Sequence, residues 1–347
     1  MAKPLLAPVI ALFFLSPIVG ELLSGSSPPA SFFQPVTLFL LAGLYGSGAI
    51  LVREAVRRWG GGWPSVLLLG AAYGILEEGV AVKSFFDPNW PDLGVLGTYG
   101  RLFGVNWVWA EWLTIYHSIY SITIPILLVE LLFSSFRSAT YLGGKGIAFF
   151  LTLISLVVTL CHFYLNPYPV TLWQMLGCFL AITILTLCAK RLRGLKLGSG
   201  ESRVRNRWLW LLGASGGFKY FFIVFGLLPT VGIPVLLTVS MGIALTILIA
   251  VIVLRLSKKG MSELNALGLA SGFLSLLIFL DPVLEASNPT PEDFRGQTAV
   301  GVVFTLFLIL LGRKTSRREA MRRRNRQAEQ FPLPPPPSLS LPAEEGF

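Results

Sequence analysis

Ionisable side chains within apolar segments are the residues of this sequence that offer the most chemistry. The adjacent pair Glu77-Glu78 is followed by His117 and His162, which are the two histidines of the 347-residue chain. A charge in hydrocarbon is costly, so an ionisable group retained there marks a candidate functional site. Two adjacent carboxylates in a medium of low dielectric cannot easily both ionise, which suits one of them to accept a proton. We therefore expect this set to act as a general base or as a carrier of protons.

A second group of polar residues is a candidate for contacts with a substrate or for a lid. One lies in a tryptophan-rich stretch typical of a membrane interface, two lie in an aromatic loop, and two lie in later apolar segments. These residues are Glu111, Asp87, Trp90, Lys219 and Asp281. The loop, residues 85–104, is long enough to cover a cavity. Lys219 is isolated in its segment, so we expect it to pair with Asp281 or the glutamate pair, or to face water.

The segments that carry these residues have the composition of membrane spans. Hydrophobic residues make up 54% of the chain and charged residues 13%, about half the roughly 25% charge of an average soluble protein. A transmembrane helix needs roughly 20 apolar residues. Ten segments are candidates, the last of them short, namely Pro4–Leu23, Pro35–Val52, Pro64–Val82, Trp107–Phe133, Ile147–Leu165, Val170–Ala189, Trp208–Leu228, Pro234–Leu254, Leu264–Leu284 and Thr298–Leu311. The sequence predicts an all-α, polytopic transmembrane helix bundle of about ten spans over residues 1–312.

The distribution of basic residues predicts the orientation of this bundle. With the N-terminus in the cytoplasm, 24 of the 28 Lys and Arg residues fall in cytoplasmic segments. Only Lys83, Arg101 and Arg295 fall outside, and Lys219 lies within a span. Since basic residues accumulate on the cytoplasmic side, we expect a multi-pass protein of the cell membrane with both termini in the cytoplasm. The net charge of +10 then indicates contact with anionic lipid headgroups rather than with nucleic acid.

The C-terminal residues differ in composition from the spans. A basic stretch at residues 313–326 is followed by a proline-rich segment that begins at Phe331. Such a segment cannot build a core, so residues 313–347 are predicted to form a disordered cytoplasmic tail. The sequence does not identify a protein partner for this tail.

The predicted topology brings the polar residues of three consecutive spans together. Glu77, His117 and His162 all fall in the outer half of the bilayer when depth is counted along each span. Asn166 lies one turn after His162, on the same helical face. Because consecutive spans with short connections are usually neighbours, we expect a shared cavity that opens toward the outside.

The order of these residues resembles the CAAX-protease and bacteriocin-processing family of intramembrane glutamic proteases. That family carries EExxxR, FxxxH and HxxxN/D motifs on separate helices. Glu77-Glu78 match the first motif, His117 matches the second, and His162 with Asn166 matches the third. The arginine position holds Val82, the phenylalanine position holds Leu113, and the match extends over residues 68–166.

The resemblance implies an intramembrane peptidase and a role for each matching residue. Glu77 or Glu78 would activate a water molecule, and His117 would orient that water or stabilise the carboxylate. His162 and Asn166 would donate hydrogen bonds to the developing oxyanion. No metal and no other cofactor is expected, and the substrate would be a peptide.

Two other classes of function remain open at this point. A proton- or ion-coupled transporter of a small molecule would use the same carboxylates and histidines as a relay for protons. A membrane scaffold without enzymatic activity would use the basic and proline-rich tail instead.

Overall fold

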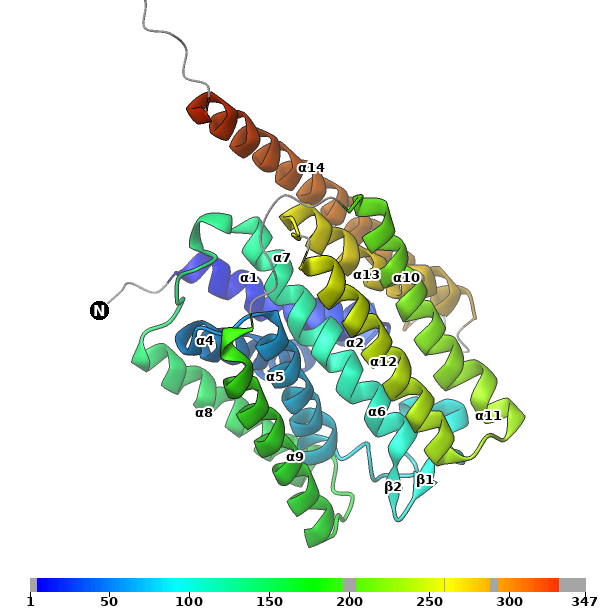
Figure 1. Ribbon diagram of the computed structural model, residues 1–347. Helices are drawn as coiled ribbons and strands as arrows, with labels where there is room; N and C mark the ends of the chain where they lie inside the picture. The colour runs from blue at the N-terminus through cyan, green and yellow to red at the C-terminus, as the bar shows by residue number, and fades with distance from the viewer. Residues whose placement is uncertain (1–4, 196–203, 259, 288–292, 331–347) are drawn as a thin grey trace, which may run out of the picture.

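The computed structural model describes residues 5–195, 204–258, 260–287 and 293–330, which form a bundle of helices (Figure 1). The first part contains α1 (Leu6–Pro17), η1 (Ile18–Leu22), α2 (Pro29–Phe32), α3 (Pro35–Leu41), η2 (Ala42–Gly46), α4 (Ser47–Trp59), α5 (Trp63–Ile75), η3 (Leu76–Ala81), η4 (Pro91–Gly97), α6 (Trp107–Tyr116), η5 (His117–Thr123), α7 (Ile124–Leu132) and η6 (Ser134–Phe136). The second part contains α8 (Gly144–Leu160), η7 (Cys161–Leu165), α9 (Leu172–Arg191), η8 (Leu192–Gly194), α10 (Asn206–Phe221), η9 (Phe222–Leu227), α11 (Leu228–Val231), α12 (Val235–Ser257), α13 (Glu263–Ser287) and α14 (Gln297–Gln330). Strands β1 (Arg101–Leu102) and β2 (Val105–Asn106) pair antiparallel, with Arg101 opposite Asn106.

The described helices correspond to the ten expected spans. Eight of them are long and apolar enough to cross a membrane, and Leu6–Leu22 is a shorter apolar helix at the first expected span. The seventh expected span, Trp208–Leu228, lies within the continuous helical residues 206–231, although it is not among the eight. The prediction of an all-α, polytopic transmembrane bundle is confirmed. The cytoplasmic location of the termini stays a prediction.

The last helix corrects the expected boundary of the C-terminal tail. α14 continues without a break from Gln297 to Gln330, so the basic residues 313–330 are helical and not part of a disordered tail. A run of Arg, Lys, Glu, Gln and Ala favours helix, which explains the continuation. The proline-rich residues 331–347 lie outside the described residues.

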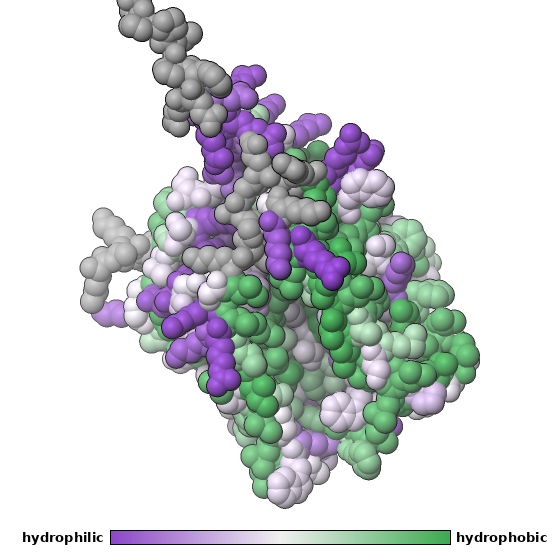
Figure 2. Space-filling model, viewed as in Figure 1, coloured by the Kyte–Doolittle hydropathy of each residue, from purple (hydrophilic) through white to green (hydrophobic). Residues whose placement is uncertain are grey.

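Burial distinguishes central helices from peripheral ones. Within an apolar stretch of 18 residues, 78% of the residues are buried in the span Trp107–Leu132 and 67% in Trp63–Ala81, whereas the share is 11% in Leu172–Gly194 and in Val235–Ser257. Figure 2 shows a largely hydrophobic face, with hydrophilic side chains gathered toward the end of the bundle from which α14 projects. Apolar surface of this extent is typical of helices that face lipid, so we expect the peripheral helices to contact the bilayer.

Several spans contain a π-helical turn, and these turns carry the polar residues that the sequence singled out. Glu77 and Glu78 lie in η3, His117 begins η5, and His162 lies in η7. π-Turns are rare and occur frequently at functional sites, because the extra residue shifts side chains that follow onto a new face. The apolar pattern alone does not reveal these turns.

Candidate functional site

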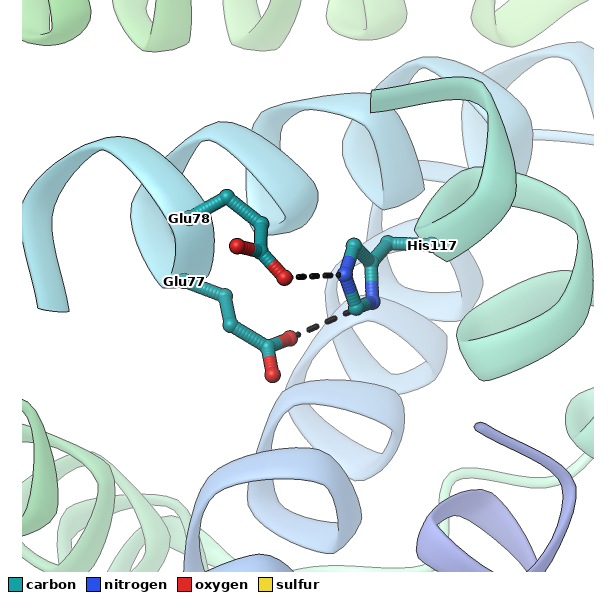
Figure 3. Close-up of side chains that lie close together, drawn as sticks. All are labelled: Glu77, Glu78 and His117. Carbon is teal, nitrogen blue, oxygen red and sulfur yellow. Dashed lines mark hydrogen bonds and ion pairs between the residues drawn. The ribbon is translucent and has the colours of Figure 1, made fainter. Parts of the chain in front are cut away.

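Glu77, Glu78 and His117 lie together in the interior of the bundle (Figure 3). The Nε2 atom of His117 is 2.9 Å from Oε1 of Glu78, and its Nδ1 atom is 3.3 Å from Oε2 of Glu77. The two carboxylates come from the π-turn η3 and reach the imidazole ring from adjacent positions, while the ring comes from the neighbouring span. The three side chains that the sequence predicted to form one site therefore converge.

Small residues on α5 allow the two spans to approach this closely. A Cβ atom added at Gly74 would lie 3.0 Å from the Cβ of His117, and one added at Gly70 would lie 2.9 Å from the Cα of Ser118. Glycine-mediated contact between membrane helices brings their backbones close, which shortens the reach required of the side chains. The glycines of α5 thus help to position the histidine against the glutamate pair.

Hydroxyl groups complete the surroundings of the cluster. The hydroxyl of Ser84 donates a hydrogen bond to Oε2 of Glu78, and the indole Nε1 of Trp109 donates to the Ser84 Oγ atom at 3.0 Å. Ser121 Oγ is 2.9 Å from the Nδ1 atom of His117. Glu78 is therefore fixed by two partners. Glu77 is 4% exposed, and its Oε2 atom accepts no hydrogen bond from the described residues.

His162 and Asn166 lie against the glutamate segment but do not point into the cluster. Nδ1 of His162 donates to the carbonyl oxygen of Val80 at 2.6 Å, and the Asn166 amide donates to the carbonyl oxygen of Val82. Both side chains thus satisfy backbone carbonyls released at the end of η3, where a helix leaves such groups unpaired. The arrangement does not place them as donors to an oxyanion, which departs from the role that the resemblance implied.

Lys83 also fixes the end of the segment that carries the glutamates, through a hydrogen bond from its ammonium group to the backbone. Its φ of +63° ends the helical segment, and its ammonium group donates to the carbonyl oxygen of His162 at 2.6 Å. Burial lowers the pKa of Lys83 from its usual range, and the nearby Asp87 carboxylate opposes that shift. Lys83 therefore contacts backbone rather than the glutamate pair.

A cavity of about 580 Å³ adjoins the cluster. Glu77, Glu78 and His117 are part of its wall, and so are Glu21 and Asp92. Aromatic and apolar side chains form much of the remaining lining, including Tyr45, Trp90, Trp109, Trp112 and Tyr116. No Lys or Arg from the described ranges lines it. The cavity therefore combines four carboxylates with an aromatic wall, an arrangement suited to a water-assisted reaction or to a cation.

The loop after η3 contributes to this cavity in part. Trp90 and Asp92 line it, which agrees with the expectation that the loop covers a cavity. Asp87 instead accepts a hydrogen bond from the Asn89 backbone at 2.9 Å and turns the chain. Arg101 fixes the loop by donating to the carbonyl oxygens of Phe86 and Asp87. Movement of the loop as a lid stays a prediction.

The remaining candidates lie apart from the cluster. Asp281 is buried, and its Oδ1 atom accepts a hydrogen bond from Gln297 at 2.6 Å. Glu111 faces α12 at Gly242, where an added Cβ atom would overlap the carboxylate of Glu111. Lys219 is exposed on α10 and forms no ion pair within the part of the chain that the structure describes. Of the two alternatives expected for Lys219, the structure shows no pair with Asp281 or with the glutamate pair, and the exposed position leaves the other alternative, that it faces water.

Glu21 was missed at the sequence level, although the same criterion would have found it. It is an ionisable residue within the first expected span, and it now lies on the cavity wall. Tyr45 and Ser27 donate hydrogen bonds to its two carboxylate oxygens.

The rings of Tyr45, Tyr73 and Tyr116 surround His117 at centroid distances of 5.7, 6.1 and 5.4 Å. These tyrosines were not distinguishable from ordinary core residues by spacing.

The three central side chains also offer ligands for a metal ion. One atom from each of Glu77, Glu78 and His117 lies within 4.8 Å of the others. Imidazole and carboxylate ligands suit several divalent cations. The expectation that the site needs no metal stays a prediction.

Fold and site together define a multi-pass integral membrane protein with a polar cluster buried among its spans. The chain belongs to an uncharacterized membrane protein family, whose model matches residues 10–331. No curated protein and no solved structure matches the chain.

Proposed function

We propose that this protein is an intramembrane hydrolase that cleaves peptide bonds by means of a carboxylate-activated water molecule. The observation that carries the proposal is the convergence of Glu77, Glu78 and His117 on the wall of a cavity within the bundle. The order of the three motifs resembles that of intramembrane glutamic proteases, which supports the same reaction class.

Glu77 is the residue proposed to act as general base. Glu77 lines the cavity, and its buried Oε2 atom accepts no hydrogen bond from the described residues, so a lone pair is available for a water proton. Glu78 is occupied by Ser84 and His117 and is proposed to hold the imidazole ring in place. His117 would then orient the water and stabilise the negative charge on Glu77.

The proposed reaction balances without a cofactor. Glu77 takes a proton from water as the water oxygen bonds to the carbonyl carbon of the substrate. The tetrahedral intermediate then collapses, the carbon–nitrogen bond breaks, and the proton held by Glu77 passes to the leaving nitrogen. The products are a new carboxyl group and a new amine.

His162 and Asn166 are proposed to act as positioning residues. Their hydrogen bonds to the carbonyl oxygens of Val80 and Val82 fix the end of the segment that carries the glutamates. A shift of this segment by about 1 Å would be enough to reduce the rate by about 100-fold.

The test is cleavage of membrane-associated peptides by the purified protein in proteoliposomes. Glu77→Gln is expected to reduce the rate by about 100-fold or more, the size typical of general-base catalysis. Glu111→Gln is a matched control, because it makes the same chemical change outside the cluster. Equal rates for wild type, Glu77→Gln and Glu78→Gln would exclude the mechanism.

A proton- or ion-coupled carrier is the second candidate, and the additional carboxylates favour it. Glu21 and Asp92 line the same cavity as the glutamate pair, and a series of carboxylates is suited to pass protons or cations. Proton flux into proteoliposomes, followed with a pH-sensitive dye, is expected to stop in Glu21→Gln if this function holds. Flux that is insensitive to both Glu21→Gln and Glu77→Gln would exclude it.

A further inference from the structure

A second polar pocket lies at the ends of several spans, separate from the glutamate cluster. Its lining includes Arg53, Arg57, Glu130 and Arg137, together with glycines that precede α5, and its volume is about 70 Å³. The pocket is located where α5 begins and α7 ends. It is therefore at the boundary between the membrane-spanning helices and their connections.

Positive charge exceeds negative charge in this pocket. Three guanidinium groups line it, and the carboxylate of Glu130 is the acidic group in the lining. Arg53 Nε is 3.2 Å from Glu130 Oε1, Arg137 Nε is 3.4 Å from Oε2, and Arg57 also contacts Oε1. Glu54 also contacts Arg53, and Glu263 also contacts Arg137, at 3.4 and 3.6 Å. Six guanidinium groups in all contact these three carboxylates, namely those of Arg53, Arg57, Arg58, Arg137, Arg318 and Arg322. The region therefore keeps a positive net charge that favours an anion.

A buried donor in the pocket has no hydrogen-bond partner of its own. Arg53 is 1% exposed, and its Nε atom donates no hydrogen bond to the described residues, although it lies beside Glu130. The Nη2 atom of the same side chain donates to the carbonyl oxygens of Arg137 and Ala139 at 3.0 and 3.1 Å. An unsatisfied buried donor is costly, and an anion in the pocket would relieve that cost.

The backbone around the pocket also favours an anion. Gly61 and Gly62 line it together with Trp63, the first residue of α5. Helix N-termini carry partial positive charge and bind phosphate groups readily. In α5, Pro64 has no N–H, and the N–H groups of Ser65 and Val66 donate to the carbonyl oxygen of Gly62 at 3.0 and 3.2 Å, which leaves the N–H of Trp63 as the donor at the start of the helix. A glycine-rich entry to a helix allows such a group to approach the backbone closely.

The other lining residues indicate that the phosphate is attached to a lipid. Trp63, Val66 and Ile126 give the pocket an apolar wall, and tryptophan is typical of the level of lipid headgroups. Arg57 and Arg137 are 26% and 37% exposed, so their guanidinium groups remain accessible from outside. Arginine matches the geometry of phosphate oxygens through paired hydrogen bonds.

We propose that this pocket, lined by Arg53, Arg57, Arg137 and the start of α5, binds the phosphate group of an anionic phospholipid. The guanidinium groups hold the phosphate oxygens, the start of α5 contributes its partial positive charge and the N–H of Trp63, and the Trp63 side chain packs beside the lipid. The site anchors the bundle at one end of α4, α5 and α7 and does not depend on the proposed hydrolase activity.

Native mass spectrometry of the full-length protein, first stripped of lipid, tests this site with three probes. These are phosphatidylglycerol, phosphatidylcholine and inorganic phosphate, added separately. Wild type is expected to retain phosphatidylglycerol in preference to phosphatidylcholine. Arg137→Gln is expected to weaken that retention by about tenfold, as the loss of a charge-assisted hydrogen bond implies. Arg58→Gln is the matched control, because Arg58 is 41% exposed and lies outside the lining.

A second pair of variants tests the pocket without removing an arginine. Gly62 precedes α5 with φ −118° and ψ −166°, a conformation open to any residue, and aspartate and asparagine are both favourable helix caps. Gly62→Asp places a negative charge in the pocket and is expected to abolish lipid retention, whereas Gly62→Asn is expected to preserve most of it. Equal retention by the two Gly62 variants, or by Arg137→Gln and Arg58→Gln, would overturn the proposal. Binding of inorganic phosphate without selection between the lipids would overturn the assignment to a lipid.

Discussion

Two clusters of buried charge lie in the same bundle, and they differ in what surrounds their carboxylates. Glu130 lies beside guanidinium nitrogens of Arg53, Arg57 and Arg137. Glu77 lies beside the single His117 ring on a cavity wall. The Oε2 atom of each glutamate accepts no hydrogen bond from the described part of the chain. Both carboxylates are buried, but guanidinium groups enclose that of Glu130, whereas that of Glu77 borders a cavity lined by other carboxylates.

This difference indicates a structural role for Glu130 and a chemical role for Glu77. A carboxylate enclosed by cations remains ionised and holds helices together, and removal of it leaves the cations uncompensated. A carboxylate with an available lone pair beside a cavity can take up a proton from a substrate or from water. The comparison therefore predicts that loss of the same carboxylate charge will affect stability in one cluster and activity in the other.

The largest expected effect on stability follows from Glu130→Gln. Arg53 would stay buried without its main counter-charge, so the free energy of unfolding is expected to fall by about 3–5 kcal/mol. Thermal unfolding in detergent measures this change. Glu77→Gln is the matched control, and it is expected to change the unfolding temperature much less, since Glu77 lies beside one imidazole ring and not three guanidinium groups. An equal loss of stability in both variants would contradict the distinction between the clusters.

Much of the fold follows from the sequence, because apolar length alone determines where a helix can cross a bilayer. The expected spans match the helices, and the glutamate pair was found by the cost of charge in hydrocarbon. The same criterion applied to Glu21 and Glu130 would have identified both. A partner for Lys219 could not be predicted for a different reason. Hydropathy does not determine which face of a span is turned outward, and Lys219 lies on an exposed face.

The roles of His162 and Asn166 could not be read from spacing. An HxxxN pattern places both side chains on one helical face. The π-turn η7 and the end of η3 determine which groups that face contacts. Both side chains meet backbone carbonyls. The basic residues after Leu311 were likewise misassigned, because a charged stretch is compatible with a solvated helix as well as with disorder.

Ser84→Ala tests how the second carboxylate of the site is held. Loss of the Ser84 hydroxyl removes a hydrogen bond to Glu78, which is worth about 1.5–3 kcal/mol when the acceptor is charged. The peptidase rate is expected to fall by about tenfold or more, with little change in KM. Ser134→Ala, at an end of the bundle away from the cavity, is a control expected to have no effect. A rate for Ser84→Ala equal to that of wild type would show that Glu78 needs no such support.

Asn166→Ala distinguishes a positioning residue from an oxyanion donor. The carbonyl oxygen of Val82 would lose its donor, so stability is expected to fall by about 1 kcal/mol together with a moderate fall in kcat. Thermal unfolding and peptide cleavage measured on the same preparation give both quantities. A fall in kcat of about 100-fold with unchanged stability would indicate direct contact with the transition state instead.

The smallest expected effect is that of a chelator. If Glu77 acts as the base, the peptidase rate is expected to be unchanged after dialysis against EDTA, because the proposed step needs no cation. Elemental analysis of the same sample checks that divalent metals have been removed. Loss of activity that returns on addition of one divalent cation would assign the three side chains to a metal site.

The origin of the oxygen atom in the product tests the central proposal most directly. Purified protein in proteoliposomes with membrane peptides is incubated in water enriched in oxygen-18, and the new peptide termini are identified by mass spectrometry. The account predicts new termini whose carboxyl groups carry one labelled oxygen in wild type, and their near absence in Glu77→Gln. Labelled termini formed equally by both proteins, or no new termini with either, would contradict it.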